Sequence, residues 1–363
     1  MVSRPQAGTD VRLAKPAVGE EELAEIRTVL ESGQLTMGPK VAEFERLLAG
    51  LAGTRDAVAV SSGTAALHVA VLALGIGPGD EVLVPAYTFP ATGNVVALAG
   101  AKPVLVDVDP VTMNMDAADA ARRVTPRTKA VLAVHLFGRP ARLEELPDGL
   151  PVIEDAAGAL GARRGDRPCG SLGSLACFSF HPRKIVTTGE GGALTTDDAS
   201  LGEASRSLRH HGWSPSHEYG DMPRPAFNYR LSDVLCALGI PQLRRFDELY
   251  AAYDRVARGY AERLAELPVT LPTTDRGDRH GWQAYVVQVD DRDRVMAELR
   301  ADGIQCQIGT YALHRLGAYC DQGGFPGADA AFERALALPL HAGLTDPELD
   351  RVAEALDKIV SSH

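Results

Sequence analysis

The sequence predicts an α/β protein: a large domain built on a mainly parallel central sheet flanked by helices, then a smaller C-terminal α+β domain. Between residues 56 and 180, short apolar runs of strand length alternate with segments of helical pattern. Such alternation is typical of a parallel sheet that is covered on both faces. The alternation stops near Arg230, where a long helical stretch begins. We therefore predict a large domain at residues 1–240 and a small domain at residues 241–363.

The N-terminal part of the chain predicts two helices. Residues 20–31 place Leu23, Ile26 and Leu30 on one stripe, and Gly33 follows at the position where helices commonly end. A loop at residues 34–39 leads to a second helix at 40–51.

Apolar runs bounded by polar or turn residues predict six strands in the large domain. They lie at residues 56–60, 81–85, 103–107, 130–135, 152–155 and 177–180, with helices at 64–74 and 92–99. The helical stretch at 233–264 contains Pro241, which lacks an N–H group and is expected to kink or break it. The small domain predicts a strand at 284–289 and helices at 292–302 and 346–360.

Composition and charge exclude several classes of protein. The 363 residues are 45% hydrophobic, carry a formal net charge of −11 and contain no block of consecutive basic residues. This argues against nucleic acid or an anionic membrane surface as the main partner. Five cysteines without a C-x-x-C pair disfavour a zinc site, an iron–sulfur cluster and a disulfide framework, so no metal is expected. Because the sequence has no signal-peptide pattern and no apolar run of membrane length, we expect a cytoplasmic protein.

One lysine has an unusual sequence context. Residues 178–192 read FSFHPRKIVTTGEGG, which places Lys184 between an apolar strand and a glycine-rich turn. A lysine at a strand end, beside backbone that can approach a ligand, suits Schiff-base chemistry because a desolvated amine loses its proton readily. Most lysines are solvated surface groups, so this motif alone leaves the simpler interpretation open.

A second motif predicts a phosphate site. Residues 61–67 (SSGTAAL) follow the first predicted strand and open a helix, and small residues there let an anion approach the free backbone N–H groups. The alternative is a plain strand–turn–helix in which Thr64 contributes to the N-cap. Further along, Tyr87 and Phe89 follow a strand end, where an aromatic side chain either stacks on a flat ring or is simply packed.

Two carboxylates, Glu154 and Asp155, end an apolar strand. A buried carboxylate needs a partner, and a protonated pyridine nitrogen would be one. The alternative is that Asp155 caps the following helix. A phosphate site, an aromatic ring, a carboxylate and a lysine thus occur in order, each at the end of a predicted strand. Together they predict a site for pyridoxal 5′-phosphate (PLP).

Segments along nearly the whole chain resemble the DegT/StrS sugar aminotransferases, a branch of the fold-type I PLP enzymes in the aspartate aminotransferase superfamily. The matching segments are residues 35–39, 62–68, 85–89, 125–129, 134–138, 154–157, 179–184, 189–192, 227–233 and 338–341. The resemblance implies that Lys184 forms the Schiff base with PLP and afterwards moves the proton. It implies that Asp155 pairs with the pyridinium nitrogen and that Phe89 stacks on the ring.

The resemblance also assigns the phosphate contacts. They would come from the backbone at Gly63, Thr64 and Ala65 and from the hydroxyl of Ser179. Asn228 would reach the phosphate of the neighbouring subunit's cofactor, which implies a homodimer with shared active sites.

The chain departs from the family pattern at two places. Members commonly carry His or Gln after Asp-Ala-Ala, near the ring hydroxyl, where this chain has Gly158. A water could replace that contact, or the pocket is reshaped. Many members carry a His-Tyr motif where this chain reads GTYALH at residues 309–314, so the resemblance makes Tyr311 and His314 candidate substrate contacts. His181 is a third candidate, and for both histidines a structural role is the alternative.

The resemblance implies an aminotransferase that moves an amino group from L-glutamate to a keto-sugar carried on a nucleoside diphosphate, in amino-sugar, secondary-metabolite or glycan biosynthesis. Lys184 argues against the sugar 3-dehydratases of the family, which have histidine at that position. Cyclitol (inosose) aminotransferases and the dehydrating aminohydroxybenzoate synthases remain alternatives. A non-catalytic PLP-sensing regulator is disfavoured, because no DNA-binding domain precedes the first matching segment and the chain has no basic surface pattern.

Overall fold

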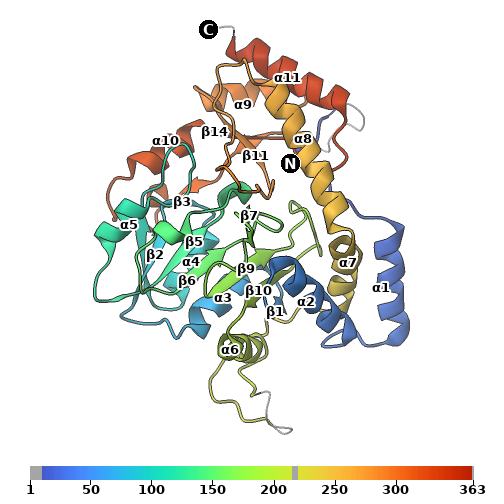
Figure 1. The fold of residues 1–363 in the computed structure, drawn as a ribbon, viewed down its shortest axis with the longest axis vertical. Helices are drawn as coiled ribbons and strands as arrows, with labels where there is room; N and C mark the ends of the chain where they lie inside the picture. The colour runs from blue at the N-terminus through green and yellow to red at the C-terminus, as the bar shows by residue number, and fades with distance from the viewer. Residues whose placement is uncertain (1–9, 215–219, 362–363) are drawn as a thin grey trace.

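A seven-stranded sheet forms the centre of the computed structural model, which describes residues 10–214 and 220–361 (Figure 1). The strand order is β1-β10-β9-β6-β5-β2-β4. The strands are β1 (Asp56–Val60), β2 (Glu81–Pro85), β4 (Lys102–Val106), β5 (Thr128–Val134), β6 (Val152–Asp155), β9 (Leu175–Ser179) and β10 (Gly192–Thr196).

Strand direction brings many strand ends to one edge of the sheet. The pairs β4–β2, β2–β5, β5–β6 and β6–β9 are parallel, whereas β10 runs antiparallel to both of its neighbours, β9 and β1. Therefore β1 runs in the same direction as β9. The carboxyl ends of β1, β2, β5, β6 and β9 meet at the edge where α/β proteins place their ligands. The predicted mainly parallel sheet is confirmed.

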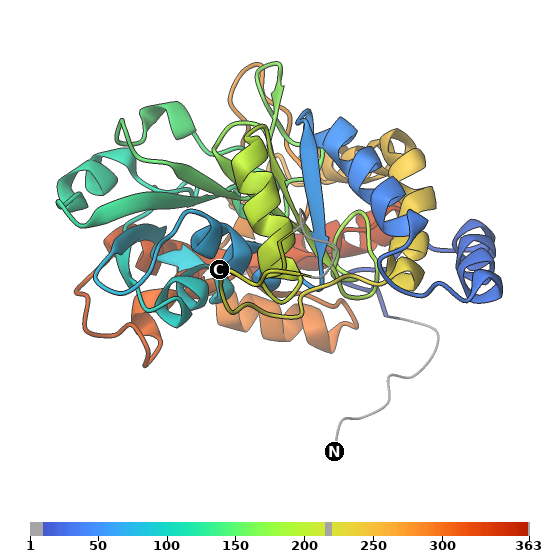
Figure 2. The ribbon, with the colours of Figure 1, turned by 90° about the horizontal axis from the view of Figure 1, so that it is seen from below.

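Helices cover both faces of the sheet (Figure 2). On one face, α3 (Gly63–Ala73), α4 (Ala91–Leu98) and α6 (Ala199–Arg209) share an apolar cluster with Val58 and Val60 of β1. On the other face, α2 (Pro39–Ala52) and α7 (Asp233–Arg244) pack with Ala57 and Ala59. The alternation along β1 follows from the strand period of two. The short helix α5 (Ala117–Arg123) lies beside β4, and α1 (Glu20–Ser32) packs against α7.

The C-terminal part adds a three-stranded antiparallel sheet with the order β11-β14-β12. Its elements, with the flanking helices, are α8 (Phe246–Arg263), β11 (Tyr285–Gln288), α9 (Arg292–Ala301), β12 (Gln307–Ile308), α10 (Pro326–Arg334), β14 (Ala335–Leu338) and α11 (Asp346–Val360). A short pair, β3 (Tyr87–Thr88) with β13 (Tyr311–Ala312), joins this part to the ligand edge of the large sheet. The remaining short elements are β7 (Arg163–Arg164), β8 (Arg167–Pro168) and the 3₁₀ turns Leu136–Gly138, Leu143–Glu145 and Leu313–Arg315.

Some predicted elements differ from the structure. The long helical stretch breaks at Arg245, four residues after Pro241, so the proline lies inside α7. The sequence did not predict β10, β14, α5, α6 or α10. Residue 240 lies within α7, and the division into two domains there stays a prediction. No helix in the described part of the chain is long and apolar enough to span a membrane.

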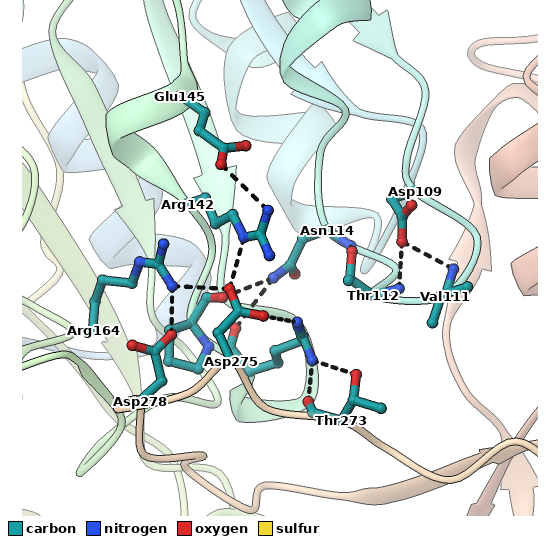
Figure 3. Close-up of polar contacts among 12 residues, drawn as sticks. Asp109, Val111, Thr112, Asn114, Arg142, Glu145, Arg164, Thr273, Asp275 and Asp278 are labelled. Carbon is teal, nitrogen blue, oxygen red and sulfur yellow. Dashed lines mark hydrogen bonds and ion pairs between the residues drawn. The ribbon is translucent and has the colours of Figure 1, made fainter.

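An ion-pair network ties the C-terminal part to the large sheet (Figure 3). The carboxylate of Asp275 accepts hydrogen bonds from Arg139 (2.8 Å), Arg142 (2.7 Å) and Arg164 (2.9 Å). Arg164 also pairs with Asp278 at 2.7 Å. The hydrogen bond from Arg142 is the largest influence on Asp275 and, with the charge of Arg139, lowers its pKa to about 2, although burial opposes the shift. The segment that leads into β11 is therefore held against the loops that follow β5 and β6.

We predict that Asp275→Asn lowers the free energy of unfolding by about 1–3 kcal/mol, because three guanidinium groups lose their shared carboxylate. The pKa of Asp275 is about 2 in the fold against 3.8 for an ordinary aspartate, so this stability is present above pH 4 and is lost as pH falls through 2. Urea denaturation of the wild type and Asp275→Asn from pH 7 to pH 3 measures the difference in their free energies of unfolding. This difference should become smaller below pH 4.

The matched control is Glu145→Gln. Glu145 pairs with Arg142 at 3.3 Å, and both side chains are half exposed, so its loss should cost less than about 0.5 kcal/mol. Equal losses for the two variants would contradict a special role for Asp275.

Candidate active site

A cavity of about 430 Å³ opens at the carboxyl edge of the large sheet. Its wall comes from the ends of five of the strands whose carboxyl ends lie at this edge: Gly63 after β1, Phe89 after β2, His135 after β5, Asp155 in β6 and Lys184 after β9. Residues of the C-terminal part, including Gln283 and Gln307, close the opposite side. The structure therefore brings the predicted phosphate site, aromatic ring, carboxylate and lysine to one cavity.

Lys184 lies in a tight turn after β9. Its backbone N–H donates to the carbonyl of His181 at 2.9 Å, and the Thr187 hydroxyl closes the turn by donating to the carbonyl of Phe180 at 2.9 Å. The side chain is only partly exposed and borders the cavity. Burial lowers the pKa of Lys184 to about 8; the charge of Asp155 opposes this shift and that of Arg183 adds to it. About a tenth of the amine is therefore unprotonated at pH 7, far more than for an ordinary lysine with a pKa of 10.5, and the unprotonated form is the one that acts as a nucleophile or a base.

The two carboxylates at the end of β6 point to opposite faces, because successive strand residues alternate. Glu154 faces away from the cavity and receives a hydrogen bond from His135 Nε2 at 2.8 Å. It also accepts from the backbone N–H groups of Gly170 (2.8 Å), Leu172 (2.7 Å) and Gly173 (2.7 Å). Burial would raise the pKa of Glu154, but these donors lower it below the usual value. Glu154 is therefore structural, and Asp155 alone reaches the cavity.

Asp155 is held in a fixed orientation. One oxygen accepts from the Thr92 hydroxyl at 2.9 Å, and the other accepts from the Ala157 N–H at 3.2 Å. Burial raises the pKa of Asp155 in spite of these two hydrogen bonds. A cation in the cavity would stabilise its ionised form, and a protonated ring nitrogen is such a cation. The residue is therefore suited to hold a pyridinium group.

The turn between β1 and α3 forms the predicted phosphate cradle. Ser62 caps α3 by accepting the Ala65 N–H on its hydroxyl at 3.0 Å. A Cβ added to Gly63 would lie 2.8 Å from Cβ of Ser179, so only glycine allows this turn to meet the end of β9 so closely. Gly63, Thr64 and Ser179 line the cavity beside the helix N-terminus. Ala65 does not line it, and its N–H is already used by the cap.

The glycine-rich turn has a different role from the one that the sequence indicated. Gly192 begins β10 and lies directly against the backbone of Ser62 and Gly63, where any Cβ would overlap. A Cβ on Gly191 would overlap the hydroxyl of Thr188. Neither glycine lines the cavity; only Glu190 of this turn does. The glycines therefore allow close packing behind the phosphate cradle rather than contact with a ligand.

The predicted aromatic and substrate residues divide into two groups. Phe89, Tyr311 and His181 line the cavity, and the rings of Phe89 and Tyr311 meet edge to face with centroids 6.2 Å apart. His314 lies outside the cavity wall and bonds through Nε2 to Asp329 of α10 at 2.9 Å. Asn228 is exposed and does not line the cavity of its own chain. Within one chain, therefore, neither His314 nor Asn228 lies with the other predicted site residues around the cavity.

Sequence reasoning missed four side chains of the site. Thr92 orients Asp155 from the first turn of α4, and Arg183 donates from Nη1 to Gln307 at 2.9 Å. Gln283 occupies the space beside Gly158: a Cβ on that glycine would lie 3.0 Å from Cβ and Cγ of Gln283. A glutamine from a distant segment therefore fills the place that a side chain at 158 would take. Only Arg183 had a local signal, its position next to Lys184.

Comparison with known proteins agrees with this geometry. The model of the DegT/DnrJ/EryC1/StrS aminotransferase family matches residues 16–357. The chain belongs to this family. It is 42% identical to a GDP-perosamine synthase of Caulobacter vibrioides over 90% of this chain and 91% of that protein.

Two solved structures of the family are similar along nearly their full lengths. DesI, solved in the presence of its TDP-sugar product, has 35% identity and a TM-score of 0.91, covering 98% of this chain and 94% of that one. The PLP form of the putative sugar aminotransferase Spr1654 from Streptococcus pneumoniae has 29% identity and a TM-score of 0.92, covering 97% and 99%. The family and the fold-type I architecture expected from the sequence are thereby confirmed, and the protein is an aminotransferase of this family.

We predict that Gly158→Ala lowers the free energy of unfolding by about 1–3 kcal/mol, because the new methyl group would press on Gln283. Gln283→Ala removes Cγ and the amide, so the double variant should recover part of this loss. A double-mutant cycle measured by urea denaturation gives the coupling between the two sites. A fully stable Gly158→Ala protein would contradict the packing described here.

Proposed function

We propose that this protein binds PLP and moves an amino group from L-glutamate to a keto-sugar carried on a nucleoside diphosphate. One observation carries the proposal: Lys184, with a pKa near 8, the buried Asp155 and the N-terminus of α3 all border one cavity. These groups match the three chemically distinct parts of PLP, which are an aldehyde, a pyridine nitrogen and a phosphate.

PLP, when bound, acts as an electron sink for the carbon that loses a proton. Asp155, fixed by Thr92 and Ala157, keeps the ring nitrogen protonated. The backbone at Gly63 and Thr64, with the Ser179 hydroxyl, would hold the phosphate, and Phe89 would stack on the ring; all four residues line the cavity. These contacts orient the reacting carbon toward the amine of Lys184, which accepts a proton on Nζ and returns it to a neighbouring carbon.

The names of two similar proteins support a nucleotide-linked sugar as the amino acceptor. The curated relative at 42% identity is a GDP-perosamine synthase, and DesI was solved with a TDP-sugar product. Both names favour a nucleotide sugar over a cyclitol. L-Glutamate as the donor follows from the family resemblance, and alternate use of the site by donor and acceptor gives ping-pong kinetics.

The proposal includes a homodimer in the cytoplasm. Asn228 lies between the exposed ring of Phe227 and a segment that meets the loop at residues 35–37, where Leu35 and Met37 are also exposed. An exposed apolar surface of this kind suits a subunit interface. Across it, Asn228 would reach the phosphate in the partner's site. The five cysteines are all free, which fits a reducing compartment.

We predict that the wild-type protein with PLP shows a yellow absorbance band that L-glutamate bleaches and that only a suitable keto-sugar restores. Lys184→Ala removes the nucleophile and the base, so turnover should fall below detection. Stopped-flow and steady-state absorbance measure both effects. Normal turnover in Lys184→Ala would overturn the assignment, as would a wild-type protein that never develops the band.

We further predict that the rate at which the apoenzyme incorporates PLP rises with pH around a midpoint near 8, because only the unprotonated Lys184 amine attacks an aldehyde. Asp155→Asn removes the charge that opposes the lowered pKa, so the midpoint should move to lower pH. Absorbance after mixing at pH 6 to pH 10 gives the profile. A midpoint near 10 in the wild-type protein would mean that the amine is fully solvated.

A further inference from the structure

Arg183 carries a positive charge that no described part of the chain neutralises. Its Nη1 donates to the neutral side-chain carbonyl of Gln307 at 2.9 Å, and its buried Nε has no hydrogen-bond partner. Burial lowers the pKa of Arg183, and no acidic group offsets that effect. Ionised groups that leave water normally find an opposite charge, because the loss of hydration is otherwise uncompensated. The guanidinium borders the cavity, so the missing charge is expected from a ligand.

The charged neighbours of Arg183 do not supply that opposite charge. Lys184 and His181 are the groups whose pKa values respond to Arg183, and in both cases the arginine charge lowers them. Of the two acidic side chains in the cavity wall, Asp155 acts on Lys184 and Glu190 acts on His181. The carboxylates in the cavity wall therefore act on groups other than Arg183, which leaves the guanidinium able to take its opposite charge from an anionic ligand.

We propose that Arg183 binds a carboxylate of the amino donor; this inference rests on the proposed function. The α-carbon of the donor must come within reach of the Lys184 amine, and its α-carboxylate is one bond away from that carbon. The diphosphate of a nucleotide-linked sugar is separated from the reacting carbon by the sugar ring. Because Arg183 directly precedes Lys184 and both residues line the cavity, the geometry favours the carboxylate. The planar guanidinium also matches two carboxylate oxygens at once.

Gln307 has a supporting role in this arrangement. Its carbonyl oxygen takes one N–H at Nη1 of the guanidinium, while no residue in the described part of the chain takes an N–H of Nη2. Because the amide is neutral, it orients Arg183 without cancelling its charge. Gln307 belongs to β12 of the three-stranded sheet, whereas Arg183 follows β9 of the large sheet. The donor site therefore depends on both sheets.

The test separates the two half-reactions of Arg183→Gln, which keeps the side-chain length and removes the charge. Bleaching of the PLP form by L-glutamate gives the apparent Kd for the donor, and recovery of colour with the keto-sugar gives that for the acceptor. We expect the donor Kd to rise about 10- to 100-fold, the loss typical of a charged hydrogen bond. The acceptor Kd should change less than about 3-fold.

Binding of glutarate provides a readout that needs no turnover. This dicarboxylate has no amino group, and calorimetric titration into the PLP-loaded protein should show the same loss in Arg183→Gln. Arg183→Lys keeps the charge but lacks the planar guanidinium, so its Kd for glutarate should lie between those of the wild type and Arg183→Gln. The exposed Arg258 pairs with Asp254 along its own helix, so it gives the control variant Arg258→Gln, whose Kd values for L-glutamate and glutarate should match those of the wild type. Equal melting temperatures establish that the variants fold.

Two results would overturn the assignment of Arg183. The first is an unchanged Kd for both L-glutamate and glutarate in Arg183→Gln. The second is a loss confined to the keto-sugar half-reaction, which would assign the guanidinium to the diphosphate. Failure of the proposed function gives a different result, since the wild-type protein would then not bleach with L-glutamate. Weaker glutarate binding in the variant would support the carboxylate site even if the keto-sugar tested is not the substrate.

Discussion

The buried carboxylate of Glu154 is the constraint on which the rest of the site depends. It joins His135 at the end of β5, its own strand β6 and the loop at residues 170–173 that leads into β9. Asp155 is the next residue along β6, and Lys184 follows β9. The relative position of the two reactive groups is therefore determined by hydrogen bonds on the opposite face of the strands. Hydrogen bonds to one charged acceptor reinforce one another, so the network around Glu154 stabilises the fold more than separate neutral pairs would. Loss of the carboxylate would leave buried N–H groups without an acceptor, which would lower the free energy of unfolding.

The sequence was sufficient for the parts of the site that depend on strand ends. In a parallel sheet all carboxyl ends meet at one edge, so the order of motifs alone indicated that Gly63, Phe89, Asp155 and Lys184 converge. The same reasoning could not find Thr92, Gln283 or Gln307. These side chains come from a helix and from the C-terminal part, and their approach depends on packing between distant segments. For His314 the sequence led to the opposite error. Its position in a motif suggested a substrate contact, but in the structure its side chain bonds to Asp329.

The missed elements have physical reasons too. β10 reads GALTT, with a glycine at its start and two threonines at its end, so its apolar content is low although every residue is buried. β14 reads ALAL and directly follows α10, so residues with high helix propensity continue a helical pattern into a strand. Tertiary contacts decide both cases: β10 is held between β1 and β9, and β14 lies between β11 and β12.

The pairing of β1 with β10 has a consequence for how the protein is made. β1 lies at the edge of the sheet, and within the described ranges β10 is the one strand that pairs with it, with Asp56 opposite Thr196. During translation, the apolar residues 57–60 leave the ribosome long before that neighbour exists. Contacts so far apart along the chain form slowly, and an unpaired apolar strand is prone to association with other chains. Productive folding of the nascent chain therefore depends on shielding this strand until synthesis has passed residue 196.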